Sequence, residues 1–269
     1  MTDPNHWQQD NPEWNQNRAS FDKVAELYDA YRPSYPNELV QFVISTSRLP
    51  ANGQILEIGC GTGTATRLFA ARGYTMVCVE PGANLAALAQ KRLKENKKVS
   101  FEVSRFEDWH EDNRRFDLVL SAQAFHWVPV EVAYTKSARI LEPAGCLALV
   151  WNMYPDLHGP VWEEMQSIYA KYWPGSTGEP ISYLELADRR TQEIIESGCF
   201  LPPQIGIFPW LKTYTTEQYL GLLSTYSDHI TLDPELREKL FVAIAKLIDS
   251  HGGQVERTYV AYAYVAQRL

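Results

Sequence analysis

The chain has 269 residues, of which 45% are hydrophobic and 22% are charged. These proportions exclude a disordered or collagen-like chain, and the length suffices for a large hydrophobic core in one or two domains. The 33 acidic and 25 basic residues leave a net charge of −8. An acidic protein is a poor candidate for nonspecific binding to phosphate backbones, so we expect no nucleic-acid partner.

The cysteines and the apolar stretches exclude several other classes. Cys60, Cys78, Cys146 and Cys199 are scattered, without a CxxC pair or metal-ligand spacing. No apolar stretch is long enough to span a membrane, and the polar start of the chain lacks the apolar core of a signal peptide. We therefore expect a cytoplasmic protein with reduced thiols, no metal site and no membrane partner. Monomer and dimer both stay open.

The N-terminal region predicts a mobile segment followed by two helices. Residues 1–18 are polar and are expected to form a flexible arm. Apolar residues at helical spacing predict a helix over 20–31, which the proline-containing segment 31–36 ends. A second helix is expected over 37–46.

The middle of the chain alternates between short apolar runs and helical patterns. This alternation is typical of an α/β fold with a parallel sheet covered by helices on both faces. The expected strands are 54–58, 75–80, 99–104, 116–121 and 146–151, and the expected helices are 64–72, 84–94 and 130–140.

The pattern becomes weaker after residue 151. Most of 152–180 resists assignment, and the last segment, 255–269, mixes strand and helix signals. Asp233 and Pro234 predict the start of a long helix, as N-cap and first helical residue. The remaining expected elements are helices over 161–171, 184–197, 216–223 and 234–250 and a strand over 205–214.

A glycine-rich loop lies between the first predicted strand and its helix. Gly59, Gly61 and Gly63 occupy alternate positions, where the absence of Cβ atoms lets a ligand approach the backbone. The helix N-terminus beyond the loop presents free N–H groups. Glu80 ends the next predicted strand, where a carboxylate can accept hydrogen bonds from a ribose diol. A tight turn and a solvated strand end are the structural alternatives.

The spacing differs from the dinucleotide fingerprint GxGxxG, because the glycines run GxGxG and Thr64 follows them. Glu57 also lies two residues before the loop, where its negative charge would repel the pyrophosphate of a dinucleotide. S-adenosylmethionine carries an ammonium, a sulfonium and a ribose, so Glu57 and Glu80 suit it electrostatically. Glu57 could equally be a structural acid bonded within the protein.

Five segments resemble the class I S-adenosylmethionine-dependent methyltransferases. Two of them are similar to a type 11 subgroup that includes trans-aconitate methyltransferase-like proteins, namely Ser121–Trp127 and Tyr31–Pro36. The resemblance covers residues 20–151 well and 152–269 loosely. The other three segments are Glu57–Thr64 with Glu80, Phe116–Ser121 and Arg139–Gly145.

The resemblance implies a Rossmann-like, seven-stranded, mostly parallel sheet with helices on both faces and a helical lid. It also implies one methyltransferase domain over 19–269. Within that domain we expect a cofactor-binding core over 19–151, and we expect 152–269 to complete the sheet and form a substrate lid. The N-terminal helices and the 214–253 helices would form the lid.

The same resemblance implies a set of cofactor contacts. Arg105 departs from the family pattern, because it stands where an acid commonly binds adenine, so we assign adenine to Phe106 and Glu107. The expected S-adenosylmethionine-binding residues are Tyr31, Arg32, Glu57, Gly59, Cys60, Gly61, Gly63, Glu80, Pro81, Phe106, Glu107, Ser121 and Gln123.

His126 follows the fourth predicted strand and is the candidate for proton transfer, since imidazole titrates near neutral pH. The alternative is that His126 and Trp127 only line the substrate pocket. Tyr226 and His229 are further candidate acceptor contacts.

We therefore expect in-line methyl transfer to a small-molecule acceptor through an oxygen, nitrogen or carbon nucleophile. Two alternatives stay open. One is an NAD-dependent oxidoreductase, which shares the strand–glycine–helix layout. The other is a non-catalytic binding module on a methyltransferase fold.

Overall fold

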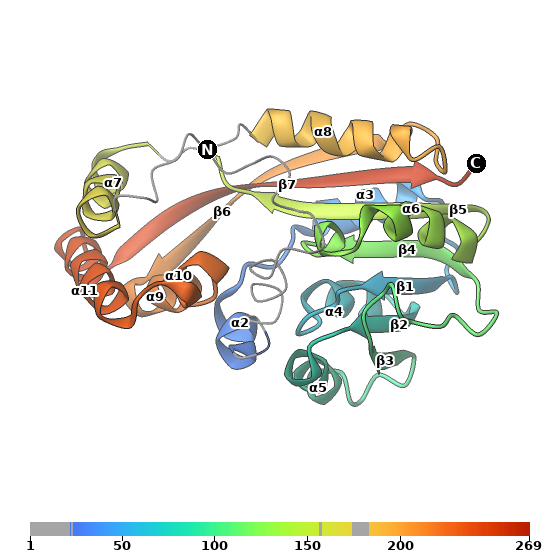
Figure 1. Cartoon of the computed structure of the whole chain (residues 1–269), viewed down its shortest axis with the longest axis horizontal. Helices are drawn as coiled ribbons and strands as arrows, with labels where there is room; N and C mark the ends of the chain where they lie inside the picture. The colour runs from blue at the N-terminus through green and yellow to red at the C-terminus, as the bar shows by residue number, and fades with distance from the viewer. Residues whose placement is uncertain (1–21, 23, 156–157, 174–182) are drawn as a thin grey trace. The chain divides into compact units, whose positions relative to one another are not determined.

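The computed structural model describes residues 22, 24–155, 158–173 and 183–269 (Figure 1). The chain divides into two compact units. The sheet unit comprises Ser34–Met153, Tyr183–Pro209 and Val260–Leu269, and the helical unit comprises Met1–Pro33, Tyr154–Ser182 and Trp210–Tyr259. The predicted arm over 1–18 lies outside the described residues, and the predicted domain boundaries and lid stay predictions.

Seven strands form one sheet in the order β3-β2-β1-β4-β5-β7-β6. Strands β1 to β5 pair in parallel, and β7 runs antiparallel to β5. The predicted seven-stranded, mostly parallel sheet is thus confirmed. The strands are β1 (Gln54–Ile58), β2 (Thr75–Glu80), β3 (Val99–Val103), β4 (Phe116–Ala122), β5 (Leu141–Met153), β6 (Gln204–Thr215) and β7 (Gln254–Gln267).

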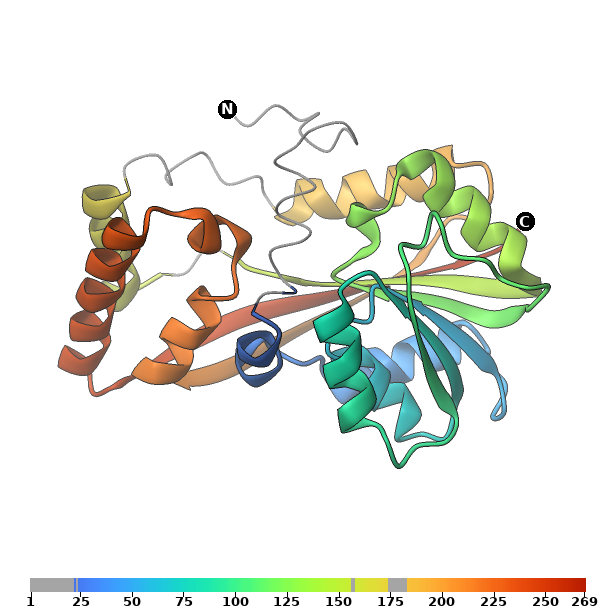
Figure 2. The same ribbon diagram turned by 60° about the horizontal axis from the view of Figure 1, so that its bottom comes forward.

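Helices cover both faces of the sheet unit. Figure 2 shows α3, α4 and α5 along one face and α6 and α8 along the other. Covered strands have no solvent side, which explains why β1 is buried continuously after its first residue. The helices are α3 (Asn37–Thr46), α4 (Thr64–Ala70), α5 (Ala83–Arg92), α6 (Val130–Ile140) and α8 (Tyr183–Glu196), with a 3₁₀ turn, η1 (Phe125–Trp127), before α6.

Aromatic side chains fill the core beneath α6 and α8. Phe125 packs edge-on against Tyr134 at 5.1 Å between ring centroids. Tyr264 of β7 meets Trp151 of β5 at 6.0 Å. Some of the chain's aromatic side chains therefore lie in the hydrophobic core of the sheet unit.

The helical unit has its own hydrophobic core. Buried members include Met165, Tyr219, Leu240 and Ile244. No helix among the described residues is long and apolar enough to cross a membrane. The helices are α2 (Ala25–Tyr31), α7 (Pro160–Tyr172), α9 (Thr216–Leu223), α10 (Ser227–Thr231) and α11 (Pro234–Ser250).

Some elements differ from their predicted bounds. Strand β5 begins at Leu141, five residues before the expected start, because the chain continues in the sheet through a register shift against β4 between Phe116 and Leu118. Residues 255–267, whose signals were mixed, lie in strand β7. Helix α10 was not predicted, since five residues are too few to show helical periodicity.

Candidate active site

The glycine loop connects β1 to α4 at the carboxyl edge of the sheet. Gly59 has a φ of +68°, and a Cβ there would lie 2.4 Å from Cβ of Ala124, so only glycine fits. The Gly59 N–H donates to the Val79 carbonyl at 2.8 Å, which ties the loop to β2. Gly63, with a φ of +82°, is the N-cap of α4.

Glu80 ends β2 and is 6% exposed. Its Oε2 accepts a hydrogen bond from the Gly61 N–H at 2.9 Å, and its Oε1 accepts one from the Gly82 N–H at 2.8 Å. Each carboxylate oxygen has a second lone pair that can accept another hydrogen bond. The strand order reverses at β1 and β4, where ligands of open α/β sheets bind. The loop and Glu80 therefore fit a ribose-containing ligand.

Glu57 lies on β1 and is 1% exposed. The Thr66 hydroxyl donates to its Oε2 at 2.6 Å, and the Cys78 thiol lies 3.9 Å from the same oxygen. Burial raises the pKa of Glu57 to about 8, although the Thr66 hydrogen bond opposes the shift. These internal contacts match the structural alternative for this acid. Cys60, in the loop, is also buried, and its pKa is raised.

The segment after β3 contains Phe106, which is 2% exposed, and Glu107, which is partly exposed. Lys136 of α6 holds this segment: its Nζ donates to the carbonyl oxygens of Phe106 at 2.6 Å and of Glu107 at 3.2 Å, and also to that of Trp109. Lys136 is itself buried. Sequence reasoning missed Lys136; the one signal was its helical spacing, three residues after Ala133 and four before Ile140, both of which are buried in α6. Arg105 is exposed.

Ser121 and Gln123 lie at the end of β4. The Ser121 hydroxyl donates to the Ile58 carbonyl at 2.9 Å and is fully buried. Gln123 has a φ of +59°, and its side-chain amide donates to the Asn152 carbonyl at 3.2 Å. Pro81 is exposed directly after Glu80. The carboxyl edge of the sheet unit thus carries the loop, Glu80, the 106–107 segment, Ser121 and Gln123.

His126 lies in the turn η1 and is half-buried. The Trp151 indole N–H faces its Nδ1 at 3.4 Å, and the Trp127 ring lies 5.0 Å away between centroids. Burial, followed by the charge of Arg190, lowers the pKa of His126 to about 3. A neutral imidazole of such low basicity suits a pocket wall better than a proton acceptor.

Four of the predicted site residues lie in the helical unit. The Tyr31 ring packs where a side chain on Gly221 would otherwise lie. Arg32 donates to the Thr225 carbonyl at 2.6 Å. His229 is buried, with Nδ1 2.7 Å from an Asp228 carboxylate oxygen and Nε2 2.9 Å from the Tyr169 hydroxyl. The fourth residue, Tyr226, contacts the His229 ring at 5.8 Å between centroids.

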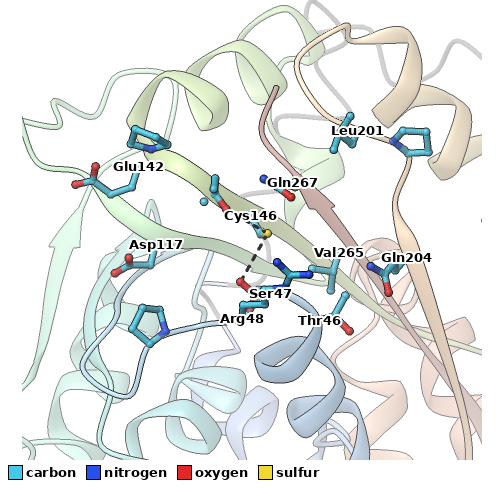
Figure 3. A pocket seen from close by; sticks show the side chains of 15 residues that line it. Thr46, Ser47, Arg48, Asp117, Glu142, Cys146, Leu201, Gln204, Val265 and Gln267 are labelled. Carbon is cyan, nitrogen blue, oxygen red and sulfur yellow. Dashed lines mark hydrogen bonds between the residues drawn. The ribbon is translucent and has the colours of Figure 1, made fainter.

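A cavity of about 330 Å³ lies at the other edge of the sheet unit. Figure 3 shows Asp117 and Glu142 at the amino ends of β4 and β5, together with Arg48 and Cys146. None of the predicted site residues lines it. No group of three or more His, Cys, Asp or Glu side chains in the described part of the chain could hold a metal ion.

Comparison with known proteins agrees with the geometry. Residues 55–145 match the model of a methyltransferase domain. An uncharacterized methyltransferase of Mycobacterium tuberculosis is 28% identical over 246 residues, which cover 91% of this chain and 92% of the relative. An uncharacterized methyltransferase of Schizosaccharomyces pombe is 25% identical over 90% of this chain and 94% of its own length.

Solved structures share the fold. A protein of Anaeromyxobacter dehalogenans, provisionally assigned as a type II methyltransferase, superimposes with a TM-score of 0.60 at 21% identity, over 89% of this chain and 97% of its own. A phosphoethanolamine N-methyltransferase of Haemonchus contortus, solved with S-adenosylhomocysteine, gives 0.52 at 16% identity, over 91% of this chain and 57% of its own.

The chain is accordingly an S-adenosylmethionine-dependent methyltransferase, with S-adenosylmethionine as its cofactor. The expected enzyme class, cofactor and fold are confirmed.

Proposed function

We propose that this enzyme acts in the cytoplasm on a small-molecule acceptor and that it is similar in function to the trans-aconitate methyltransferase-like subgroup. The observation that carries the cofactor site is the position of Glu80, whose carboxylate is held by the Gly61 and Gly82 N–H groups at the reversal of the strand order. The Ser121–Trp127 and Tyr31–Pro36 segments support the subgroup.

The residues of the sheet unit have distinct proposed roles around the cofactor. Glu80 accepts hydrogen bonds from the ribose hydroxyls, and the loop Gly59–Gly63 lets the ligand lie against the backbone. Phe106 and Glu107 form the adenine side, which Lys136 holds in place through backbone carbonyls. When bound, S-adenosylmethionine supplies a methyl group on a positively charged sulfur.

The protein contributes mainly by positioning. Holding a nucleophile in line with the methyl group replaces a bimolecular encounter, which accounts for roughly 7–11 kcal/mol of a barrier. His126 and Trp127 form part of the acceptor wall. The low pKa of His126 makes an acceptor that is already ionised, or that loses its proton elsewhere, the better match.

Substitution of Glu80 tests the cofactor site. We expect Glu80→Ala to weaken S-adenosylhomocysteine binding at least about tenfold, equivalent to about 1.4 kcal/mol. Because Glu80 also holds the loop, the informative readout is discrimination against the 2′,3′-dideoxy analogue. Wild type should prefer the natural ribose, and Glu80→Ala and Glu80→Gln should lose that preference.

Glu142→Gln is the matched control, because Glu142 is exposed at the start of β5. It should bind like wild type. If Glu80→Ala keeps its preference for the intact ribose, the proposed role of Glu80 is wrong.

A transfer assay with labelled cofactor tests the small-molecule acceptor. Carboxylic acids, phenols and amines are supplied separately, and we expect label transfer to members of one of these classes. Cofactor binding without transfer to any acceptor would instead favour the non-catalytic module.

A further inference from the structure

Two arginines of the helical unit share one tyrosine ring. The Arg32 guanidinium carbon lies 4.5 Å from the centroid of the Tyr226 ring, and that of Arg257 lies 5.9 Å from the same centroid. Arg257 also lies 4.7 Å from the Tyr154 centroid, and Arg32 lies 5.0 Å from that of Tyr28. Two positive charges, distant in sequence, therefore occupy one tyrosine cluster.

The two guanidinium groups are incompletely satisfied. Arg32 donates from Nη2 to the Thr225 carbonyl at 2.6 Å, and Arg257 donates from Nη1 to the Tyr226 hydroxyl at 3.1 Å. The Nε atoms of both are inaccessible to solvent and have no acceptor. Among the salt bridges between described residues, none pairs a carboxylate with Arg32 or Arg257.

The contacts with aromatic rings do not complete this arrangement. A cation over an aromatic ring contributes about 0.5–2 kcal/mol, but it gives the in-plane N–H groups no acceptor. A buried donor without an acceptor costs about 1–3 kcal/mol. Two like charges withdrawn from water, with no carboxylate of the described residues paired to them, add a further penalty. A negatively charged acceptor group would relieve both costs.

We propose that Arg32 and Arg257 form a binding site for an organic carboxylate. A guanidinium presents a planar fork of donors that matches the two oxygens of a carboxylate. The rings of Tyr28, Tyr154 and Tyr226 suit an apolar body attached to that group, whereas a free phosphate has no such body and is more strongly hydrated. Neutral tyrosine hydroxyls supply further donors.

The proposed carboxylate site does not depend on the methyl-transfer activity, because its test measures only the binding of the acid. Two sources could supply the carboxylate: a free organic acid or the methionine moiety of the cofactor, whose expected binding residues include Arg32. We assign the site to a free acid. Binding of the cofactor product must therefore be measured beside binding of the acid.

Thermal unfolding of the full chain is measured with benzoate, succinate and citrate, with benzamide and succinamide as uncharged analogues, and with inorganic phosphate. We expect at least one carboxylate to raise Tm by several degrees in a concentration-dependent way, and its uncharged analogue and phosphate to have no such effect. For that acid, Arg257→Gln and Arg32→Gln should bind at least about tenfold more weakly, as measured by calorimetry.

Lys246→Gln is the matched control, because it removes an exposed positive charge from the same unit. It should bind the acid like wild type. Wild type, Arg257→Gln and Lys246→Gln should bind S-adenosylhomocysteine within about twofold of one another. If an arginine variant does not fold, Tyr226→Phe provides a second test, because it keeps the ring and removes only the hydroxyl that accepts from Arg257; it should bind the acid more weakly than wild type.

Three results would overturn the proposal. In the first, none of the three carboxylates stabilises the wild-type protein. In the second, phosphate or the uncharged analogues stabilise it equally. In the third, the arginine variants lose S-adenosylhomocysteine affinity and keep their affinity for the acid, which would assign the pair to the cofactor.

Discussion

Glu57, which is buried, and His126, which is half-buried, are titratable groups of the sheet unit whose pKa values move in opposite directions. Burial raises the pKa of Glu57 from 4.5 to about 8 and lowers that of His126 from 6.5 to about 3. The Glu57 contribution to stability is complete below pH 4.5 and is lost as the pH rises towards 8. The His126 contribution is complete above pH 6.5 and is lost as the pH falls towards 3.

Between pH 6.5 and 8 only Glu57 of this pair contributes to the pH dependence. We expect the free energy of unfolding of the cofactor-free protein to fall by about 1–2 kcal/mol across this range, because the folded protein retains a proton that the unfolded chain releases. Denaturant unfolding at several pH values measures the slope. Glu57→Gln, which keeps the shape and cannot ionise, should flatten it; equal slopes in the two proteins would contradict a raised pKa at Glu57.

Lys136 links two elements, helix α6 and the segment after β3. Its ammonium donates to carbonyls of Phe106, Glu107 and Trp109, while the Trp109 indole N–H donates to Glu102 of β3 at 2.6 Å. Two interactions therefore hold the backbone that is proposed to bind adenine. The Lys136 ammonium ties it to helix α6, and the hydrogen bond from the Trp109 indole to Glu102 ties it to strand β3.

We expect Lys136→Met to lower the free energy of unfolding by about 1–3 kcal/mol, because three carbonyls lose a charged donor. Amide hydrogen exchange over residues 105–109 should become about tenfold faster while that of β1 stays unchanged. Lys91→Met, at an exposed position of α5, is the control and should match wild type. Unchanged exchange over 105–109 in Lys136→Met would show that the lysine does not hold the segment.

Helices α2 and α9 of the helical unit meet at a glycine. A Cβ on Gly221 would lie 2.4 Å from two ring carbons of Tyr31 and 2.7 Å from its Cγ. Alanine normally favours a helix by about 1 kcal/mol over glycine. Here the ring would have to move as a whole, since Cγ, the ring atom bonded to Cβ, also lies too close to the added methyl group.

We therefore expect Gly221→Ala to destabilise the protein by about 1–3 kcal/mol. In the Tyr31→Ala background, where the obstructing ring is absent, the same substitution should be neutral or stabilising. A double-mutant cycle of unfolding free energies measures this reversal. Additive effects would mean that Tyr31 does not pack on Gly221.

At the scale of the whole molecule, the sequence predicted the parts that follow repeating patterns. Residues 54–58 and 75–80 are strands with the expected bounds. Short apolar runs beside a glycine loop have few other secondary structures open to them. Helix α11 starts at Pro234 as expected, since the Asp233 side chain accepts hydrogen bonds from two N–H groups of the first turn. Local chemistry determines these features.

Features that depend on distant contacts could not be predicted from the sequence. Lys136 reaches carbonyls about thirty residues away, and Arg32 and Arg257 meet at one ring across more than two hundred residues. The aromatic residues after position 150 divide between two hydrophobic cores, as Trp151 and Tyr219 show. Sequence spacing carries no signal for such pairings.

The glycine loop and Glu80 are proposed to form a site for S-adenosylmethionine and not for a dinucleotide. Calorimetric titration of the wild-type protein with S-adenosylhomocysteine and with NADH, under the same conditions, tests it most directly. We predict one-to-one binding of S-adenosylhomocysteine and binding of NADH that is at least about a hundredfold weaker, a difference of about 2.7 kcal/mol. Tighter binding of NADH than of S-adenosylhomocysteine would contradict this assignment.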